Sequence, residues 1–248
     1  MKKIYIALLL AFYGQSVSMF AQDVWKITAD SIKLDNYYGI TVANGMVGLV
    51  SSPEPLKLSQ IVLGETYDVY GRGRVKNFLH GMNMMDVELR IDGTLVTFAK
   101  ISNFSQTLDM RRGIFGGMFD YKSCVHVEYE YTALRHLPYS CLLSVTVIPH
   151  EDVELSVANV LSTHESLRES QESFHRVFNG KIPIDLSTSI AKSPTGKVEL
   201  GSCAVFLFAD SLLRPEIQHR MVRGVGIHTQ EFCIHLQKGK PYRVSLVG

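Results

Sequence analysis

The fold is decided by the stretch Val125-His126-Val127-Glu128-Tyr129-Glu130-Tyr131, in which apolar and polar side chains alternate. Successive side chains of a β-strand point to opposite faces, so this pattern predicts a strand with one buried and one solvated face. The next apolar run, residues 141–148, is almost uninterrupted and is closed by Pro149. Such a run is typical of a strand that is buried on both faces. Both stretches indicate a β-rich fold.

Two further alternating patterns predict hairpins. Residues 87–91 alternate up to Asp92-Gly93, a dipeptide that favours the tight turn of a two-residue hairpin, and residues 95–99 are expected to form the returning strand. Residues 232–236 and 242–246 also alternate, and the short segment between them contains glycine and proline. We therefore predict that these last two strands form a hairpin.

One segment favours a helix. Residues 162–180 open with a capping-box pattern, Ser162-x-x-Glu165, and end at Gly180, a residue type that often terminates helices. The segment is so polar that a solvated loop is the alternative. Residues 187–197 are rich in Ser, Thr, Pro and Gly and predict a surface loop. We predict an all-β domain, a large antiparallel sandwich of two sheets with at most one short helix.

The N-terminus has the features of a secretion signal. Two lysines precede an apolar run over residues 4–12, and small residues follow up to Ala21, after which we expect cleavage. This run is shorter than the ~20 residues that a membrane-spanning helix needs, and no later segment is suited to a membrane span. We predict a signal peptide over residues 1–21, a sandwich domain over residues 22–248, and export to the periplasm or the extracellular space.

The charge balance excludes nucleic acid as a partner. The chain has 25 basic and 24 acidic residues, a net charge of +1, and no basic stripe. None of its four cysteines belongs to a CxxC pair, so zinc or thioredoxin-like chemistry has no support. Each lies in or beside an apolar, strand-like run, and both buried free thiols and two disulfides remain open. The cysteines are Cys124, Cys141, Cys203 and Cys233.

Catalytic and cofactor motifs do not occur in the sequence. It contains no GxSxG, HExxH, GxGxxG or P-loop pattern, so we assign no catalytic residue and no cofactor. His126, Glu128 and Glu130 lie on one face of their predicted strand and have the side chains that a metal site needs. A solvated polar face is the commoner meaning of such a pattern, and we assign no metal.

One region has the composition of a sugar-binding surface. Between Asp68 and Asp86 the chain carries aromatic and planar polar side chains, interrupted by three glycines. Aromatic rings stack on the C–H face of a sugar, and polar side chains pair with its hydroxyl groups. The alternative is an ordinary long loop. The substrate-binding candidates in this segment are Asp68, Tyr70, Phe78 and Asn83.

Several short motifs occur in order along the chain from about Trp25 to its end. They are an ANG-x-x-G pattern within residues 38–49; Tyr67-Asp68, Phe78 and Asn83 ahead of an IDG turn at residues 91–93; an LDMR-x-G pattern within residues 106–113; and residues 134–138 and 239–242. In order and spacing these motifs resemble glycoside hydrolase family 65, which includes disaccharide phosphorylases and α-glucoside hydrolases.

The resemblance implies the family's N-terminal super-sandwich of two large antiparallel sheets. In this family the catalytic glutamate lies in a downstream (α/α)6 barrel, and the sequence stops at Gly248 without one, so no catalytic residue is carried over. The implied partners are an α-glucoside-type carbohydrate, a helical catalytic domain or chain, and a second copy in a homodimer. The segment from Asp68 to Asp86 is our candidate for a loop lent to the sugar pocket. The secretion signal favours a hydrolase.

Three functions are compatible with the sequence. The first is the non-catalytic N-terminal domain of an exported glycosidase that acts on α-glucosidic di- or oligosaccharides. The second is a free-standing secreted carbohydrate-binding or assembly module, and the third is a stand-alone enzyme with an unrecognised site. A domain separated from its catalytic partner should expose an apolar patch where that partner docks. A free-standing module should instead have a polar surface and measurable sugar affinity.

Overall fold

The computed structural model describes residues 23–71, 75–209, 214–222 and 227–248. The predicted signal peptide and its cleavage point after Ala21 lie outside the described residues. The described residues form eighteen β-strands and short 3₁₀ turns, and the all-β prediction is confirmed. Over these same ranges, no helix has the length and apolar character that a membrane crossing requires.

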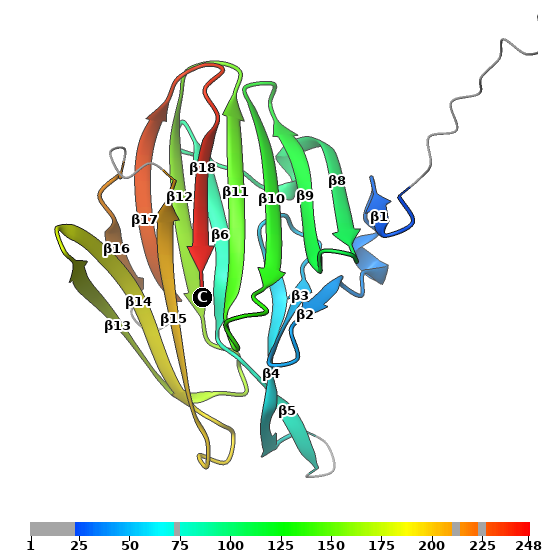
Figure 1. Cartoon of the computed structure of the whole chain (residues 1–248), viewed down its shortest axis with the longest axis vertical. Coiled ribbons are helices and arrows are strands. Elements are labelled where there is room, and N and C mark those ends of the chain that lie inside the picture. Colours follow the sequence, from blue (N-terminus) through cyan, green and yellow to red (C-terminus); the bar gives the residue numbers. More distant parts are fainter. Residues whose placement is uncertain (1–22, 72–74, 210–213, 223–226) are drawn as a thin grey trace, which may run out of the picture.

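The larger layer is a nine-stranded antiparallel sheet that runs from β1 at one side of the molecule to β13 at the other (Figure 1). Its strands in spatial order are β1 (Lys26–Ala29), β8 (Ile101–Asp109), β9 (Ile114–Tyr121), β10 (Val125–Ala133), β11 (Cys141–Pro149), β18 (Tyr242–Val247), β15 (Glu199–Phe208), β14 (Ile182–Lys192) and β13 (Arg168–Asn179).

Two smaller antiparallel sheets form the second layer. The five-stranded sheet has the order β16 (Gln218–Val222), β17 (Ile227–Leu236), β12 (Val153–Ser162), β6 (Asn83–Ile91) and β7 (Thr94–Leu95). The four-stranded sheet has the order β2 (Thr41–Ala43), β3 (Val47–Ser51), β4 (Leu58–Val69) and β5 (Lys76–His80). Buried apolar side chains from all three sheets join in one cluster, so the fold is a sandwich.

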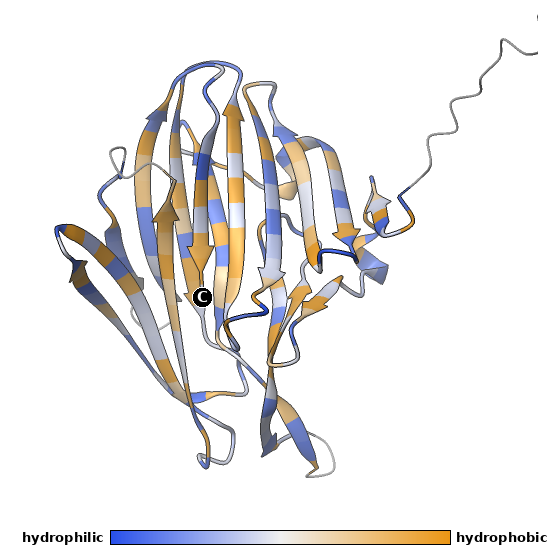
Figure 2. Ribbon diagram, in the orientation of Figure 1, coloured by the Kyte–Doolittle hydropathy of each residue, from blue (hydrophilic) through white to orange (hydrophobic). Residues whose placement is uncertain are grey.

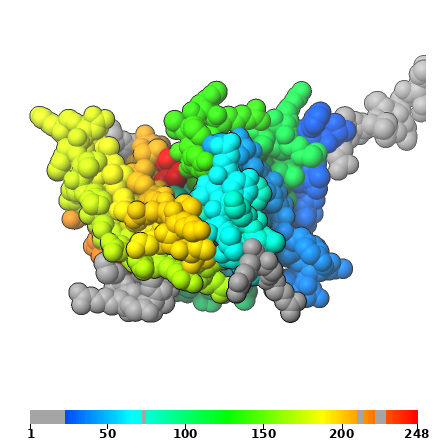
Figure 3. Space-filling view, turned by 90° about the horizontal axis from the view of Figure 1, so that it is seen from below, coloured from blue at the N-terminus to red at the C-terminus, as the bar shows by residue number. Residues whose placement is uncertain are grey.

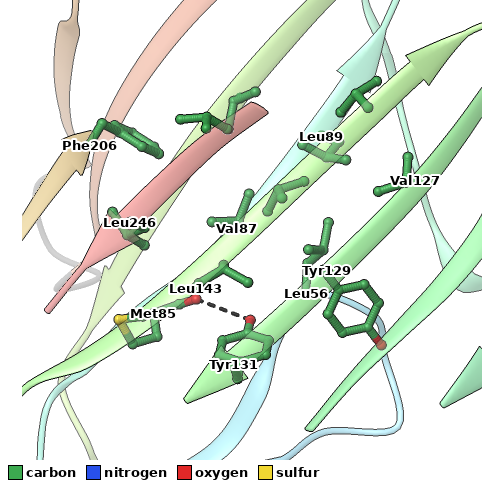
Figure 4. Packing of buried hydrophobic residues seen from close by; sticks show 14 of the residues in the cluster. Leu56, Met85, Val87, Leu89, Val127, Tyr129, Tyr131, Leu143, Phe206 and Leu246 are labelled. Carbon is green, nitrogen blue, oxygen red and sulfur yellow. Dashed lines mark hydrogen bonds between the residues drawn. The ribbon is translucent and has the colours of Figure 1, made fainter. Parts of the chain in front are cut away.

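The core lies between the two layers. The alternation predicted for residues 125–131 is confirmed, because the valines and tyrosines of β10 are buried and its glutamates face outward. The buried valines and tyrosines of β10 share one apolar cluster with Leu89 of β6 and Val157 of β12. The hydroxyl of Tyr131 donates a hydrogen bond of 3.2 Å to the carbonyl oxygen of Met85, so this buried polar group is satisfied (Figure 4).

The predicted final hairpin is wrong. β17 pairs with β12 in the five-stranded sheet, where Phe232 lies opposite Val157, whereas β18 pairs with β11 in the nine-stranded sheet, where Val244 lies opposite Val145. The connection at residues 237–241 therefore crosses from one layer to the other. Both strands bury one face, so alternation alone does not distinguish a hairpin within one sheet from a connection between two packed sheets.

The turn at Asp92-Gly93 is confirmed. Its two residues have φ values of 48° and 74°, the left-handed conformation that a type I′ hairpin turn requires. It joins β6 to β7, which pair with each other. The expected returning strand over residues 95–99 is largely wrong, because β7 ends at Leu95 and residues 98–100 form a 3₁₀ turn.

The helix considered for residues 162–180 is wrong, because this segment contributes strand β13. Phe174 and Phe178 are four positions apart, and this spacing keeps two side chains on one face of a strand as well as of a helix. The predicted surface loop over residues 187–197 is wrong in its first half. There β14 continues, and it buries Ser187 completely.

The cysteines are free thiols, which settles the two alternatives left open by the sequence. Cys124 and Cys141 are buried, whereas Cys203 and Cys233 are exposed. The two exposed cysteines belong to β15 and β17, which lie in opposite layers and turn these side chains outward. A disulfide needs Cα atoms within about 7 Å of each other, so thiols on the two outer surfaces of a sandwich do not meet.

Candidate functional site

The segment expected as a recognition loop, residues 68–86, is mostly a β-hairpin. β4 and β5 pair antiparallel, with Tyr67 opposite Phe78. The residues at the tip, 72–74, lie outside the described part of the chain. The hairpin projects from one end of the sandwich (Figure 1), and seen from that end it lies against the segment that joins β14 to β15 (Figure 3). Three of the four predicted residues are thereby brought together: Asp68, Tyr70 and Phe78.

Tyr67 and Phe78 form an exposed aromatic pair. Their side chains are 47% and 49% exposed, and their ring centroids lie 4.6 Å apart. Phe78 also borders a shallow apolar hollow of about 280 Å³ on the outward face of the four-stranded sheet, where Ala43, Gly48 and Val62 contribute small side chains or none. Aromatic rings left in solvent beside a hollow suit the C–H face of a sugar.

Asp68 anchors the hairpin and is itself buried. Its carboxylate accepts hydrogen bonds from the backbone N–H of Thr195 at 2.9 Å and from the Thr195 hydroxyl at 2.7 Å. Side-chain hydrogen bonding from Ser193, together with Thr195, holds the pKa of Asp68 well below its ordinary value. Asp68 therefore ties β4 to the turn between β14 and β15, and its oxygens are already engaged within the fold.

Tyr70 is held by its own hairpin. Its hydroxyl donates a hydrogen bond to the carbonyl oxygen of Phe78, and its carbonyl oxygen accepts one of 2.9 Å from Asn77 Nδ2. Its ring lies edge-on to His80 at 6.2 Å, and His80 in turn stacks on His164 at 4.3 Å. Burial raises the pKa of Tyr70 and lowers the pKa of His80.

Asn83 fixes the start of β6. Its Nδ2 donates hydrogen bonds to the Leu58 carbonyl oxygen at 3.1 Å and to Asp86 Oδ1 at 2.9 Å, and its Oδ1 accepts one from the Met85 N–H at 3.2 Å. Asp86 also accepts a hydrogen bond of 2.8 Å from the Leu58 N–H, and burial of its carboxyl group raises its pKa to about 6. Asn83 and Asp86 thus join β4 to β6.

Replacing Asp86 with asparagine should stabilise the domain at pH 8 by roughly 1–3 kcal/mol and have little effect at pH 4. The folded-state pKa of about 6 lies above the ordinary 3.8, so the free energy of unfolding falls as the pH rises between these values and stays low above them. Asparagine keeps an oxygen acceptor for the Leu58 N–H without the charge. Chemical denaturation at both pH values measures the difference, and Glu151→Gln in an exposed turn is the control. An equal effect of D86N at both pH values would contradict the raised pKa.

The outward face of β10 lines a polar groove of about 400 Å³ on the nine-stranded sheet. Glu130 Oε1 lies 3.5 Å from Arg112 Nη1, and His126 Nδ1 lies 2.5 Å from Asp120 Oδ1. Glu128 Oε1 lies 3.6 Å from the other ring nitrogen of His126. These side chains therefore pair among themselves. Across the described residues, no group of three His, Cys, Asp or Glu side chains has an arrangement that holds a metal ion.

The other half of this outward face is apolar. A cross-strand row runs over four neighbouring strands, with Leu142 opposite Val247, Val247 opposite Val205, and Val205 opposite Leu186. Figure 2 shows that β11 and β15 are rich in hydrophobic residues, and the alternation of burial along these strands assigns Leu142, Val205 and Leu207 to the outward side. We call this surface the apolar outer face; its members, all half-buried or exposed, are Leu142, Val177, Leu186, Val205, Leu207 and Val247.

The apolar outer face departs from the usual composition of a solvated sheet surface, which is polar. A contiguous exposed apolar patch usually marks a surface that binds a partner. A sequence signal for it exists in residues 141–148, which have the pattern of a strand buried on both faces. In the structure Leu143 and Val145 are buried, whereas Leu142 on the outward side is only half-buried.

The structure is a β-sandwich domain that exposes an aromatic pair on its β4–β5 hairpin and an apolar outer face on its nine-stranded sheet. Residues 40–245 match the family described as "Glycosyl hydrolase family 65, N-terminal domain". The chain belongs to this family.

Two curated relatives agree with this assignment, and one solved structure shares the fold. The chain is 42% identical over 231 residues to a kojibiose hydrolase of Flavobacterium johnsoniae, covering 93% of the chain and 34% of that protein. It is 41% identical over 242 residues to a kojibiose hydrolase of Mucilaginibacter mallensis, covering 97% of the chain and 36% of that protein. The structure titled "Putative kojibiose phosphorylase from human microbiome" shares the fold, with a TM-score of 0.69 at 10% identity over 90% of the chain and 32% of the other. The chain spans about a third of the length of these proteins.

Proposed function

We propose that the chain serves as the non-catalytic N-terminal domain of an exported family 65 glycosidase that acts on α-glucosidic di- and oligosaccharides. Its apolar outer face packs on a helical catalytic domain, and its β4–β5 hairpin lends Tyr67 and Phe78 to the sugar pocket. The substrate class is supported by the two relatives, which are named kojibiose hydrolases. Export rests on the signal-like composition of residues 1–21.

The apolar outer face is the observation that carries this proposal. A sheet surface on which Val247, Val205 and Leu186 follow one another across neighbouring strands is unfavourable in water. Covering it removes apolar area from solvent, which is the main driving force for the association of protein surfaces. The relatives are about three times as long as the chain, so each contains enough further sequence for a second domain.

The aromatic pair provides the test of the sugar-pocket role. In the full-length protein, replacing Tyr67 and Phe78 with alanine should raise KM for α-glucosides roughly 30-fold, since each of the two lost stacking contacts costs on the order of 1 kcal/mol. The melting temperature should hardly change, because both side chains are about half exposed. Phe178→Ala, which removes another exposed aromatic ring, is the control.

Two measurements distinguish sugar binding from packing of the hairpin. They are steady-state kinetics on a panel of α-glucosides and differential scanning calorimetry of the same samples. An unchanged KM together with a clear loss of thermal stability would mean that the pair packs the hairpin and does not contact sugar.

A free-standing carbohydrate-binding module is the second candidate, and the same exposed aromatic pair favours it. The intact mass of the native protein separates the two. A mass near three times the 27.8 kDa of this chain fits the multidomain enzyme, as in the relatives that the chain covers to 34% and 36%. A mass below 27.8 kDa fits the module and makes sugar affinity of the isolated chain the next measurement.

A further inference from the structure

A polar cluster lies inside the sandwich at the side opposite β1, where the edges of two sheets meet. There β13 and β14 of the nine-stranded sheet pack against β16 and β17 of the five-stranded sheet (Figure 1). The ring of Phe174 in β13 contacts two histidines of the other sheet. Its centroid lies 3.9 Å from that of His219 and 4.4 Å from that of His228. We call this cluster the polar wedge; its members are Glu172, Ser187, Ser189, His219, His228 and Gln230.

The pairing of the strands places these side chains next to one another. Ser187 lies opposite Phe174 on the neighbouring strand, and Ser189 lies opposite Glu172. His219 lies opposite Gln230, whose Nε2 donates a hydrogen bond of 3.4 Å to the carbonyl oxygen of Ala204. Ala204 is in turn the partner of Ser187 across β14 and β15. The side chains of the polar wedge are therefore neighbours and form one cluster across the two sheets.

Most polar atoms of the wedge are buried without a hydrogen-bond partner. His228 and Ser187 are completely buried, and Ser189 is 2% exposed. Unpaired buried polar atoms are strongly unfavourable, and a domain of ordinary stability does not tolerate seven of them in one place. The seven atoms are Glu172 Oε1, Ser187 Oγ, Ser189 Oγ, His219 Nδ1, His228 Nδ1, His228 Nε2 and Gln230 Oε1.

The hydrogen-bonding capacity of these seven atoms determines which kind of occupant can pair with them. The carboxylate of Glu172 and the amide oxygen of Gln230 accept hydrogen bonds, whereas serine hydroxyls and a neutral imidazole both donate and accept. Burial lowers the pKa of His219 and of His228, which favours their neutral forms. An occupant must therefore offer hydrogen-bond donors and acceptors at once.

Anions and metal ions fit poorly. Glu172 repels an anion, and the nearby guanidinium of Arg176 is already engaged by Asp185, with its Nε 2.7 Å from Asp185 Oδ1. Within the part of the chain that the structure describes, no three His, Cys, Asp or Glu side chains are arranged to bind a metal ion. Oxygen atoms of hydroxyl type satisfy the requirement, because each of them donates and accepts hydrogen bonds.

We propose that the polar wedge is an internal binding site for hydroxyl oxygens. They come either from ordered water or from the hydroxyl groups of a small polyol such as glycerol or a monosaccharide. A buried water makes about three hydrogen bonds, so seven unpaired atoms call for two or three oxygens. This site lies apart from the aromatic pair and the apolar outer face, and the inference does not depend on the proposed function.

Thermal stability of serine variants tests whether the wedge is occupied. If Ser187 and Ser189 bind an occupant, replacing both with alanine should lower the melting temperature by about 2–4 °C for each lost hydrogen bond. If their hydroxyls are unpaired, the same double variant should melt at a higher temperature, and that result would overturn the proposal. Ser173→Ala, on the exposed outward face of the adjoining strand, is the control.

A titration separates the two sources of the oxygens. With ¹⁵N-labelled protein, the side-chain signals of His228 are followed while glycerol or glucose is added. A saturable shift that the Ser187→Ala/Ser189→Ala variant lacks identifies a polyol site. Absence of a shift, together with a crystal structure showing two or three waters bonded to Ser187 and His228, identifies water as the occupant. A crystal structure with the wedge empty, or with its side chains bonded only to one another, would refute the proposal.

Discussion

Lysine in place of both Leu186 and Val205 should reduce the activity of the full-length glycosidase by more than about 100-fold while leaving the sandwich folded. Both side chains lie on the apolar outer face, so the isolated domain keeps the two charges in water. In the full-length protein, packing of the catalytic domain would bury them without partners, at a cost of several kcal/mol per charge. Activity of the variant, with circular dichroism of the isolated domain, measures the two effects separately.

The control for this experiment carries the same charges elsewhere. Gln60→Lys combined with His235→Lys places two lysines at exposed, outward positions of strands in the opposite layer. This control should retain nearly full activity. If the Leu186→Lys/Val205→Lys protein kept its activity within about twofold, the apolar outer face would be a solvent-facing surface in the enzyme, and the docking proposal would fail.

Alanine in place of Gly116 should destabilise the domain by about 3 kcal/mol, which corresponds to a drop in melting temperature of roughly 6–12 °C. A methyl group at this position in β9 would overlap the carbonyl oxygen of Tyr129 on the paired strand β10. A backbone atom within a sheet ladder does not move aside without breaking hydrogen bonds. Thermal denaturation of the isolated domain measures the loss.

Gly201 provides the matched comparison. It also lies within a strand of the nine-stranded sheet, but a methyl group there would meet no atom within 4 Å. Gly201→Ala should therefore leave the domain unchanged or slightly more stable, since glycine in a strand interior costs conformational entropy. Equal effects at the two positions would show that loss of glycine flexibility, and not overlap with Tyr129, determines the result.

The parts of the fold that are predictable from sequence are those that local periodicity determines. Residues 125–131 alternate with period two and form β10, and Asp92-Gly93 forms the expected turn because few other dipeptides adopt its left-handed conformation. Failures occur where one pattern fits two structures. The spacing of Phe174 and Phe178 suits a strand and a helix alike, and the alternation in β17 and β18 does not reveal that they belong to different sheets.

The candidate site is less predictable, because the role of a polar side chain depends on partners far away in sequence. Asp68 looks available from sequence, yet Thr195, 127 positions later, occupies its carboxylate. Asn83 is likewise engaged by Leu58. Phe78 is the predicted residue that stays exposed, and its partner Tyr67 is identified only once the register of the hairpin is known.

The position of β18 has a consequence for biosynthesis. This strand is the last of the eighteen, yet it lies in the interior of the nine-stranded sheet, between β11 and β15. Until β18 is available for pairing, the sheet exists as two halves with bare edges, each open to wrong pairing. The chain must be kept from aggregating until this last strand pairs. A stop codon that removes β18 would abolish the domain rather than shorten it.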